Sequence, residues 1–170
     1  PVPVIVKETG CGIAPDEARL LLEAGVRYVD VAGSGGTNWM TVEGYRLSPE
    51  EQSVIDEFAG WGMPTGVLVA ATRGLSGKML ASGGLRTGMD VAKVVALGAE
   101  SAGLALPFIR AVTEGGVEGG LALVRRLSAV IRNAMVLSGS HSVQALRQAP
   151  LIKSQAFTQM VEALTDATGV

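Results

Sequence analysis

The sequence predicts an α/β fold in which parallel strands alternate with helices, and two features support this prediction. Four short apolar segments, residues 4–6, 28–32, 79–82 and 101–104, are nearly continuous rather than alternating. This pattern is typical of strands covered on both faces in a parallel sheet. Helical segments lie between them, and the long middle interval leaves room for one extra helix.

The first predicted helices have recognisable start and stop signals. One spans residues 15–24, with a proline in its first turn, and ends at Gly25. The extra helix begins after Ser48, which forms a capping-box pattern with Glu51 three residues later. A third helix begins at the proline of the segment 64–72.

The second half of the chain is mostly helical. A fourth helix is capped by Thr87 with Asp90 and ends at Gly98. A long amphipathic helix covers residues 117–135, and the tail, residues 141–170, is predicted to form one or two short helices.

Repeated strand and helix units with right-handed crossovers fit a small doubly wound sheet or half of a TIM (β/α)8 barrel. A whole barrel needs about 250 residues, whereas this chain has 170. The sequence also begins inside a predicted strand. We therefore interpret residues 1–170 as a single domain that forms the C-terminal half of a TIM barrel, with the N-terminal half missing from this sequence.

The composition excludes several classes of partner and site. The 14 basic and 16 acidic residues give a net charge of -2, without the positive excess that nucleic acid requires. One cysteine and one histidine cannot form a structural zinc site or an internal disulfide. No apolar stretch reaches membrane-spanning length and no signal peptide is recognisable, so we expect a cytoplasmic protein without membrane contact.

Two loops with glycine follow the third and fourth predicted strands, where TIM barrels frequently bind phosphate. Segment 82–88 leads into a helix N-terminus and offers free backbone N–H groups and Arg86 to an anion. Segment 103–107 also enters a helix. Alternatively, the glycines only form tight turns and Arg86 is a solvated charge. Two such loops on adjacent strands favour the phosphate-binding interpretation.

Other polar residues follow the first two strands. Lys7 either points toward a bound ligand or extends from the strand end into solvent. Segment 33–39 supplies a hydroxyl, an amide and an indole, although packing on a neighbouring helix is the favoured interpretation of Trp39 taken alone. Glu8 and Asp30, at the strand ends, are candidates to orient Lys7 or loop amides.

Cys11 has no histidine nearby in the sequence to activate it, and His141 is flanked by serines. We therefore interpret Cys11 as a packing residue rather than a nucleophile, and His141 as a surface or helix-start residue.

Four segments together, residues 4–12, 30–39, 81–88 and 105–108, resemble type 2 isopentenyl-diphosphate isomerase. The resemblance extends from residue 1 to about residue 151, and its most discriminating part is Gly-Gly-Thr-Asn-Trp, which ends at Trp39. The Gly-Gly-x-Arg segment that ends at Arg86 is common to many FMN barrels.

The resemblance implies a flavoprotein that interconverts isopentenyl and dimethylallyl diphosphate in isoprenoid biosynthesis, using reduced FMN for proton transfer. It also implies NADPH as the reductant of the flavin and Mg²⁺ for the substrate diphosphate, and we expect a homo-oligomer. Lys7 would stabilise negative charge on the flavin ring, and Trp39 would lie near the substrate. The residues that would hold FMN are Lys7, Thr37, Gly83, Gly84, Arg86, Leu104 and Ala105.

The family's basic residues for the diphosphate and its glutamine and glutamate for substrate and metal lie upstream of the matching segments. No catalytic residue or metal ligand is therefore assigned in this chain, and we expect the 170-residue chain alone to be inactive. Two other hypotheses stay open. One is another FMN-dependent TIM-barrel oxidoreductase, and the other is a non-catalytic half-barrel that binds phosphate or dimerises through its sheet edges.

Overall fold

The computed structural model describes residues 2–75 and 78–170, and its centre is a parallel sheet with the strand order β1-β2-β3-β4. The elements follow one another as β1 (Ile5–Lys7), α1 (Pro15–Glu23), β2 (Tyr28–Asp30), α2 (Trp39–Gly44), α3 (Pro49–Asp56), α4 (Thr65–Ala71), β3 (Lys78–Ala81), α5 (Gly88–Leu97), β4 (Ser101–Ala102), α6 (Leu106–Leu137), α7 (Val143–Leu146) and α8 (Gln155–Thr168).

Consecutive strands are neighbours in the sheet and all run parallel, so that their carboxyl ends meet at one edge. Lys7 on β1 is the register partner of Asp30 on β2, and Asp30 is the partner of Leu80 on β3. Register partners point to the same face of a parallel sheet. Lys7 and Asp30 are therefore brought side by side at the end where the strands give way to loops.

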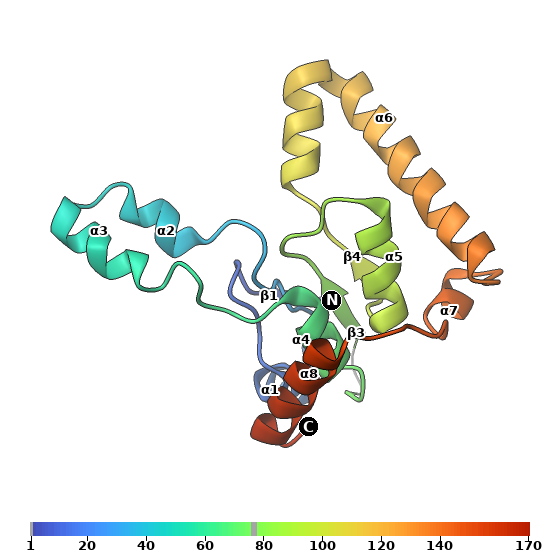
Figure 1. Ribbon diagram of the computed structural model, residues 1–170, viewed down its shortest axis with the longest axis horizontal. Helices are drawn as coiled ribbons and strands as arrows, with labels where there is room; N and C mark the ends of the chain where they lie inside the picture. Colours follow the sequence, from blue (N-terminus) through green and yellow to red (C-terminus); the bar gives the residue numbers. More distant parts are fainter. Residues whose placement is uncertain (1, 76–77) are drawn as a thin grey trace.

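Helices cover one face of this sheet, and the hydrophobic core lies between the helices and that face (Figure 1). Val29 and Val31 of the β2 segment are fully buried, together with Leu68 of α4. Ile5 belongs to the opposite face and is 56% exposed. This is the arrangement of four βα units with one face left open, and it confirms the predicted half of a TIM barrel.

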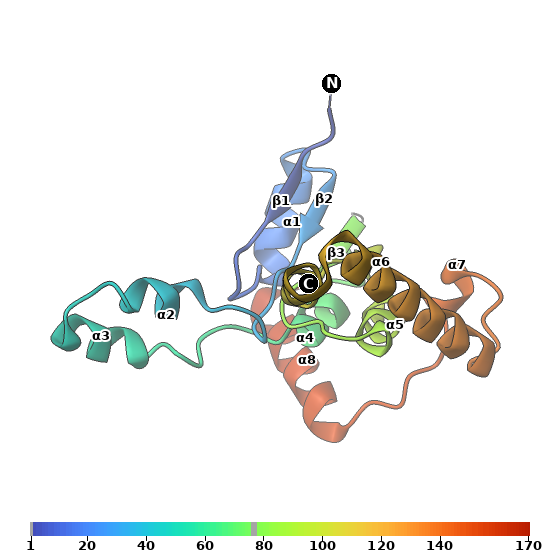
Figure 2. The ribbon, with the colours of Figure 1, turned by 90° about the horizontal axis from the view of Figure 1, so that it is seen from above.

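The C-terminal helix contributes to this core. Helix α8 packs against α1 and α4, and Figure 2 shows it beside α4. Phe157 and Leu164 of α8 are partly buried against the core cluster. The tail therefore forms two helices, as predicted, and the second of them is part of the packed body.

Two segments depart from the regular alternation of strands and helices: one projects from the body, and the other, α6, packs against α5. Helices α2 and α3 form an arm that projects from the sheet end (Figures 1 and 2). Helix α6 bends sharply at Gly116, whose backbone is non-helical, and its two parts lie close enough that Gly119 meets the carbonyl oxygen of Ala111. None of the described helices is long and apolar enough to cross a membrane.

The predicted elements are present, with several boundaries moved. β1 and β3 have the predicted lengths but are shifted by one residue, whereas β2 and β4 are shorter than predicted, and β4 has only the residues Ser101 and Ala102. Helix α2, which begins at Trp39, was not predicted, because its six residues are too few for a periodic pattern. Helix α6 begins at Leu106, as expected of a segment 103–107 that enters a helix, and includes the amphipathic stretch 117–135, with a bend at Gly116 between the two parts.

Candidate functional site

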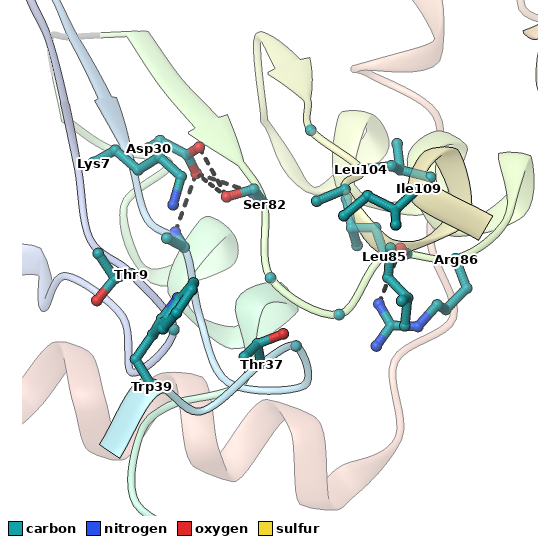
Figure 3. A pocket seen from close by; sticks show the side chains of 18 residues that line it. Lys7, Thr9, Asp30, Thr37, Trp39, Ser82, Leu85, Arg86, Leu104 and Ile109 are labelled. Carbon is teal, nitrogen blue, oxygen red and sulfur yellow. Dashed lines mark hydrogen bonds between the residues drawn. The ribbon is translucent and has the colours of Figure 1, made fainter. Parts of the chain in front are cut away.

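The loops that follow the four strands line one cavity of about 580 Å³ (Figure 3). All eight residues that the sequence assigns to the flavin or substrate site lie in its wall: Lys7, Thr37, Trp39, Gly83, Gly84, Arg86, Leu104 and Ala105. The parallel register explains this convergence, because every strand delivers its following loop to the same edge.

Lys7 and Glu8 have separate tasks at the end of β1. The Lys7 ammonium is exposed and donates a hydrogen bond of 2.6 Å to the backbone oxygen of Glu8. The Glu8 Oε2 atom accepts three backbone N–H bonds, from Gly10 at 2.5 Å, Cys11 at 2.6 Å and Gly12 at 2.8 Å. The carboxylate thereby holds the loop after β1 in a tight turn.

The pKa of the Glu8 carboxyl reflects this arrangement. Burial raises its pKa, but the backbone hydrogen bonds from Gly12, Thr9, Gly10 and Cys11 outweigh burial and lower the pKa to about 2. Glu8 is therefore an anion that shapes the loop, as expected of a residue orienting loop amides.

Asp30 connects the ends of β2 and β3. Its carboxylate is buried, and its Oδ1 atom accepts hydrogen bonds from the backbone N–H groups of Ala32, at 3.1 Å, and Ser82, at 3.0 Å. The Ser82 hydroxyl donates to Oδ2 at 2.8 Å (Figure 3). Among the described residues Lys7 forms no ion pair with Asp30, so this carboxylate orients a loop amide and not the lysine.

The Gly83-Gly84 turn approaches the loop after β2 backbone to backbone. Both glycines have positive φ angles, +92° and +80°. A Cβ atom on Gly84 would lie 2.7 Å from the carbonyl oxygen of Gly35, and one on Gly83 would overlap the carbonyl oxygen of Gly33. Within the described parts of the chain, neither Gly83 nor Gly84 uses its N–H in a hydrogen bond. Two amides in the cavity wall are thus available to an anion.

Two amides in the predicted anion-binding segment 82–88 are already bound within the chain. The Asp90 carboxylate accepts hydrogen bonds from the N–H groups of Arg86, at 3.0 Å, and Thr87, at 2.8 Å. Burial raises the pKa of the Asp90 carboxyl, but the hydrogen bonds from these two amides and the Thr87 hydroxyl, together with the charge of Lys93, outweigh burial. The pKa of Asp90 therefore lies below its ordinary value. The Asp90 carboxylate therefore binds the two amides just before α5, whereas the amides of the glycine pair, three residues earlier, stay free of hydrogen bonds within the described residues.

Arg86 and Trp39 occupy opposite sides of the cavity (Figure 3). The Arg86 guanidinium donates to the carbonyl oxygens of Gly35, at 3.1 Å, and Leu85, at 3.2 Å, which ties the loops after β2 and β3 together. Trp39 is 55% exposed at the start of α2 instead of packing on a helix. The packing interpretation of Trp39 is wrong, because α2 turns its ring toward the cavity.

Two further residues support the loops of the cavity: Cys11 through its backbone carbonyl group, and Thr65 through its side chain. Cys11 is partly buried, and its carbonyl oxygen accepts a hydrogen bond of 2.9 Å from Met63 N–H. The buried Thr65 hydroxyl contacts the loop after β3, a role that was not predicted, since one threonine beside a proline has no distinctive pattern.

The cavity fits FMN in its charges and its shape. Lys7 and Arg86 are the cations in its wall, and the one carboxylate there, Asp30, is already satisfied by hydrogen bonds. Because Gly83 and Gly84 have no side chain, a phosphate can approach their two free amides closely. By contrast, the described residues include no cluster of three or more histidine, cysteine, aspartate or glutamate side chains that could bind a metal ion.

Several curated proteins similar to this chain are isopentenyl-diphosphate delta-isomerases. The isopentenyl-diphosphate delta-isomerase of Methanothrix thermoacetophila is 43% identical over 155 residues, covering 89% of this chain and 43% of the relative. The same enzyme of Halobacterium salinarum is 41% identical over 170 residues, covering 98% and 47%. The chain therefore spans less than half of the length of these relatives.

Solved structures of two oxidases share the fold of this chain. A mandelate oxidase matches with a TM-score of 0.66 and 24% identity, over 90% of this chain and 42% of the oxidase. A lactate oxidase of Pediococcus acidilactici matches with a TM-score of 0.65 and 23% identity, over 90% and 38%.

The model of the family described as FMN-dependent dehydrogenase matches residues 1–153. That range includes every strand and every loop of the cavity. The chain therefore belongs to the FMN-dependent dehydrogenase family.

Proposed function

We propose that the protein to which this chain belongs interconverts isopentenyl and dimethylallyl diphosphate with the help of FMN. The observation that carries the proposal is the single cavity in which Lys7, the Gly83-Gly84 amides and Arg86 meet. The identity of 38–45% to isopentenyl-diphosphate delta-isomerases supports the choice of reaction. Bound FMN supplies the proton-transfer chemistry of the allylic shift.

The residues of this chain hold and charge the site. The Gly83 and Gly84 N–H groups and the Arg86 guanidinium bind the phosphate, next to Leu104 and Ala105 of the loop after β4. Lys7, at the opposite side of the cavity, places a positive charge where it stabilises negative charge on a bound ring. Thr37 contacts the cofactor from the loop after β2.

The site also has a side for the substrate. Trp39 offers an apolar ring that excludes water from the end of the cavity nearest α2. NADPH as the reductant, Mg²⁺ for the diphosphate, a cytoplasmic location and a homo-oligomer complete the proposal on the strength of the family resemblance. Residues 1–170 act in it as one domain that lacks the metal and diphosphate ligands, so the 170-residue chain alone is inactive.

The proposal is tested on the protein expressed from its complete reading frame. We expect flavin absorbance to copurify, and isopentenyl and dimethylallyl diphosphate to interconvert with FMN, NADPH and Mg²⁺ without stoichiometric consumption of reductant. Lys7→Gln should lower kcat by about 100-fold, as loss of a charge-stabilising donor does. A colourless protein that binds no added FMN would contradict the proposal.

A second candidate is an FMN-dependent oxidoreductase of the same fold. The similarity to mandelate and lactate oxidases supports the shared fold, but at 23–24% identity it says nothing further. This candidate predicts net oxidation of a small substrate, with one reduced flavin for each product molecule. Net oxidation of a small substrate, with consumption of an electron acceptor and without interconversion of the diphosphates, would favour it over the isomerase.

A further inference from the structure

Thr65 is a buried hydroxyl at the start of an apolar helix. It is 4% exposed and is the first residue of α4, whose other residues are glycine, valine, leucine and alanine. The residue before it, Pro64, is the N-cap of α4 and offers no side-chain cap. The Thr65 hydroxyl does not serve its own helix either, because it donates across the structure to the loop after β3.

The contact is made to two successive carbonyl groups. Thr65 Oγ1 lies 3.0 Å from the backbone oxygen of Ser82 and 2.6 Å from that of Gly83. In a trans peptide the C=O and the following N–H point in opposite directions. Two carbonyls drawn toward Thr65 therefore turn the N–H groups of Gly83 and Gly84 away from it.

Thr65 stands behind the loop, outside the cavity wall that Gly83 and Gly84 line. We take the side of the loop that faces away from Thr65 as the side of the cavity, and the N–H groups of Gly83 and Gly84 form no hydrogen bond within the described residues. The Thr65 backbone is itself fixed, because a Cβ atom on Gly33 would lie 2.5 Å from its nitrogen.

The residues before Thr65 connect it to the other loops of the site. Met63 N–H donates to the carbonyl oxygen of Cys11 at 2.9 Å, and the carbonyl oxygen of Met63 accepts from Ser34 N–H at 2.8 Å. One short segment, residues 63–65, thus contacts the loops after β1, β2 and β3. The arm formed by α2 and α3 leads directly into this segment (Figure 1).

We propose that Thr65 is a positioning residue for the phosphate group of the bound flavin: its hydroxyl orients two peptide planes so that the Gly83 and Gly84 amides face the phosphate. This inference rests on the proposed FMN site. It assigns the hydroxyl an effect on the phosphate monoester but not on the ring, because the proposed function places the Gly83 and Gly84 amides at the phosphate.

The test compares FMN with riboflavin, which has the same ring and lacks the phosphate. Flavin fluorescence quenching gives both Kd values for the protein expressed from its complete reading frame. Thr65→Val removes the hydroxyl at nearly constant volume, and we expect the Kd for FMN to rise about fivefold to tenfold. The Kd for riboflavin should stay unchanged, and Thr65→Ser should restore FMN binding.

Thr72 provides a matched control at the other end of the same helix. It is 1% exposed, follows α4, and its hydroxyl donates to Leu68 and Val69 within the helix. Thr72→Val therefore removes a buried hydroxyl that does not reach the loop after β3. It should leave the ratio of the two Kd values at its wild-type value.

Two results would overturn the inference. If Thr65→Val binds FMN as tightly as the wild type does, or weakens FMN and riboflavin equally, the role of Thr65 is merely structural. If Thr65→Val does not fold, Thr65→Ser against Thr65→Ala makes the same comparison with a smaller side chain. A wild-type protein that binds neither flavin would instead refute the proposed function, and the role of Thr65 with it.

Discussion

The loops at the carboxyl ends of the strands and the arm formed by α2 and α3 use glycine in different ways. Gly83, in the loop after β3, adopts a positive φ and packs directly against the Gly33 backbone. Gly60, at the end of the arm, has open space where a Cβ atom would stand and no positive φ. The turn at Gly83 has one permitted shape, whereas Gly60 has room for a side chain. A site that must hold a phosphate in fixed geometry is built from the first kind of region.

The same difference holds for carboxylates. Asp30 and Glu8 are satisfied by backbone N–H groups within the site loops. Asp56 and Glu51 of the arm form only exposed contacts inside their own helix or its cap. Substitution at matched positions in the two regions therefore tests whether the loops are the rigid part of the molecule.

The largest effect is expected for Gly83→Ala. The added methyl group would overlap the Gly33 carbonyl oxygen at a φ of +92°, so we expect a loss of about 3 kcal/mol in the free energy of unfolding. Gly60→Ala should change it by less than about 0.5 kcal/mol. Urea unfolding of both variants measures the difference, and equal effects would remove the contrast between the regions.

Asp30→Asn is expected to have the next largest effect. The amide keeps one acceptor oxygen but weakens the hydrogen bonds from Ala32 and Ser82, at a cost of about 2 kcal/mol. In the arm, the Asp56 carboxylate accepts only an exposed hydrogen bond from Gln52, so Asp56→Asn should cost less than about 0.5 kcal/mol. Urea midpoints measured side by side decide this, and a loss for Asp56→Asn as large as that for Asp30→Asn would contradict it.

Glu8 should make stability depend on pH in the acid range. Its pKa is lowered from 4.5 to about 2 in the folded chain, so its contribution is complete above the unfolded pKa and is lost as the pH falls toward 2. Because the carboxyl is only partly buried, we expect a contribution of about 1 to 2 kcal/mol.

The measurement for Glu8 is the difference in unfolding free energy between wild type and Glu8→Gln. This difference should be largest above about pH 5 and should close as the pH is lowered toward the folded pKa. Glu51→Gln is the control in the arm, since glutamine also completes a capping box. A Glu8 difference that stays constant with pH would show that the charge does not hold the loop.

The smallest effect is expected for Asn38→Ala at the base of the arm. Asn38 caps α2 by accepting from Met40 N–H at 2.9 Å, and its amide donates to Phe58 O at 3.3 Å. The loss of this cap should cost about 1 kcal/mol, confined to the arm. Hydrogen exchange of residues 39–61 should accelerate about fivefold while the urea midpoint of the body stays the same. Faster exchange throughout the sheet would show that the arm and body unfold together.

Much of this architecture follows from local sequence patterns. The apolar strand segments, the capping boxes at Ser48 and Thr87, and the stop at Gly98 act over a few residues, so the sequence is sufficient to place them. The glycine loops also predict where the cavity lies, because parallel strands bring their following loops to one edge. The roles of the individual side chains in that cavity stay predictions that the experiments above test.

Other features depend on contacts between distant segments. Asp90 is recognisable in the sequence as a capping residue, but only the folded chain shows that its carboxylate takes up the Arg86 and Thr87 amides and leaves free those of Gly83 and Gly84. Trp39 faces the cavity because α2 begins at that residue, which no periodic pattern revealed.

The sequence alone determined the class of fold, the order of the elements and the segments that form the site, since each depends on interactions between near neighbours along the chain. Only the tertiary structure decided which polar groups remain free and which are already paired. Thr65 illustrates the reason, because its hydroxyl meets carbonyl groups 17 and 18 residues away. Such a pairing exists only once β3 and α4 have packed together.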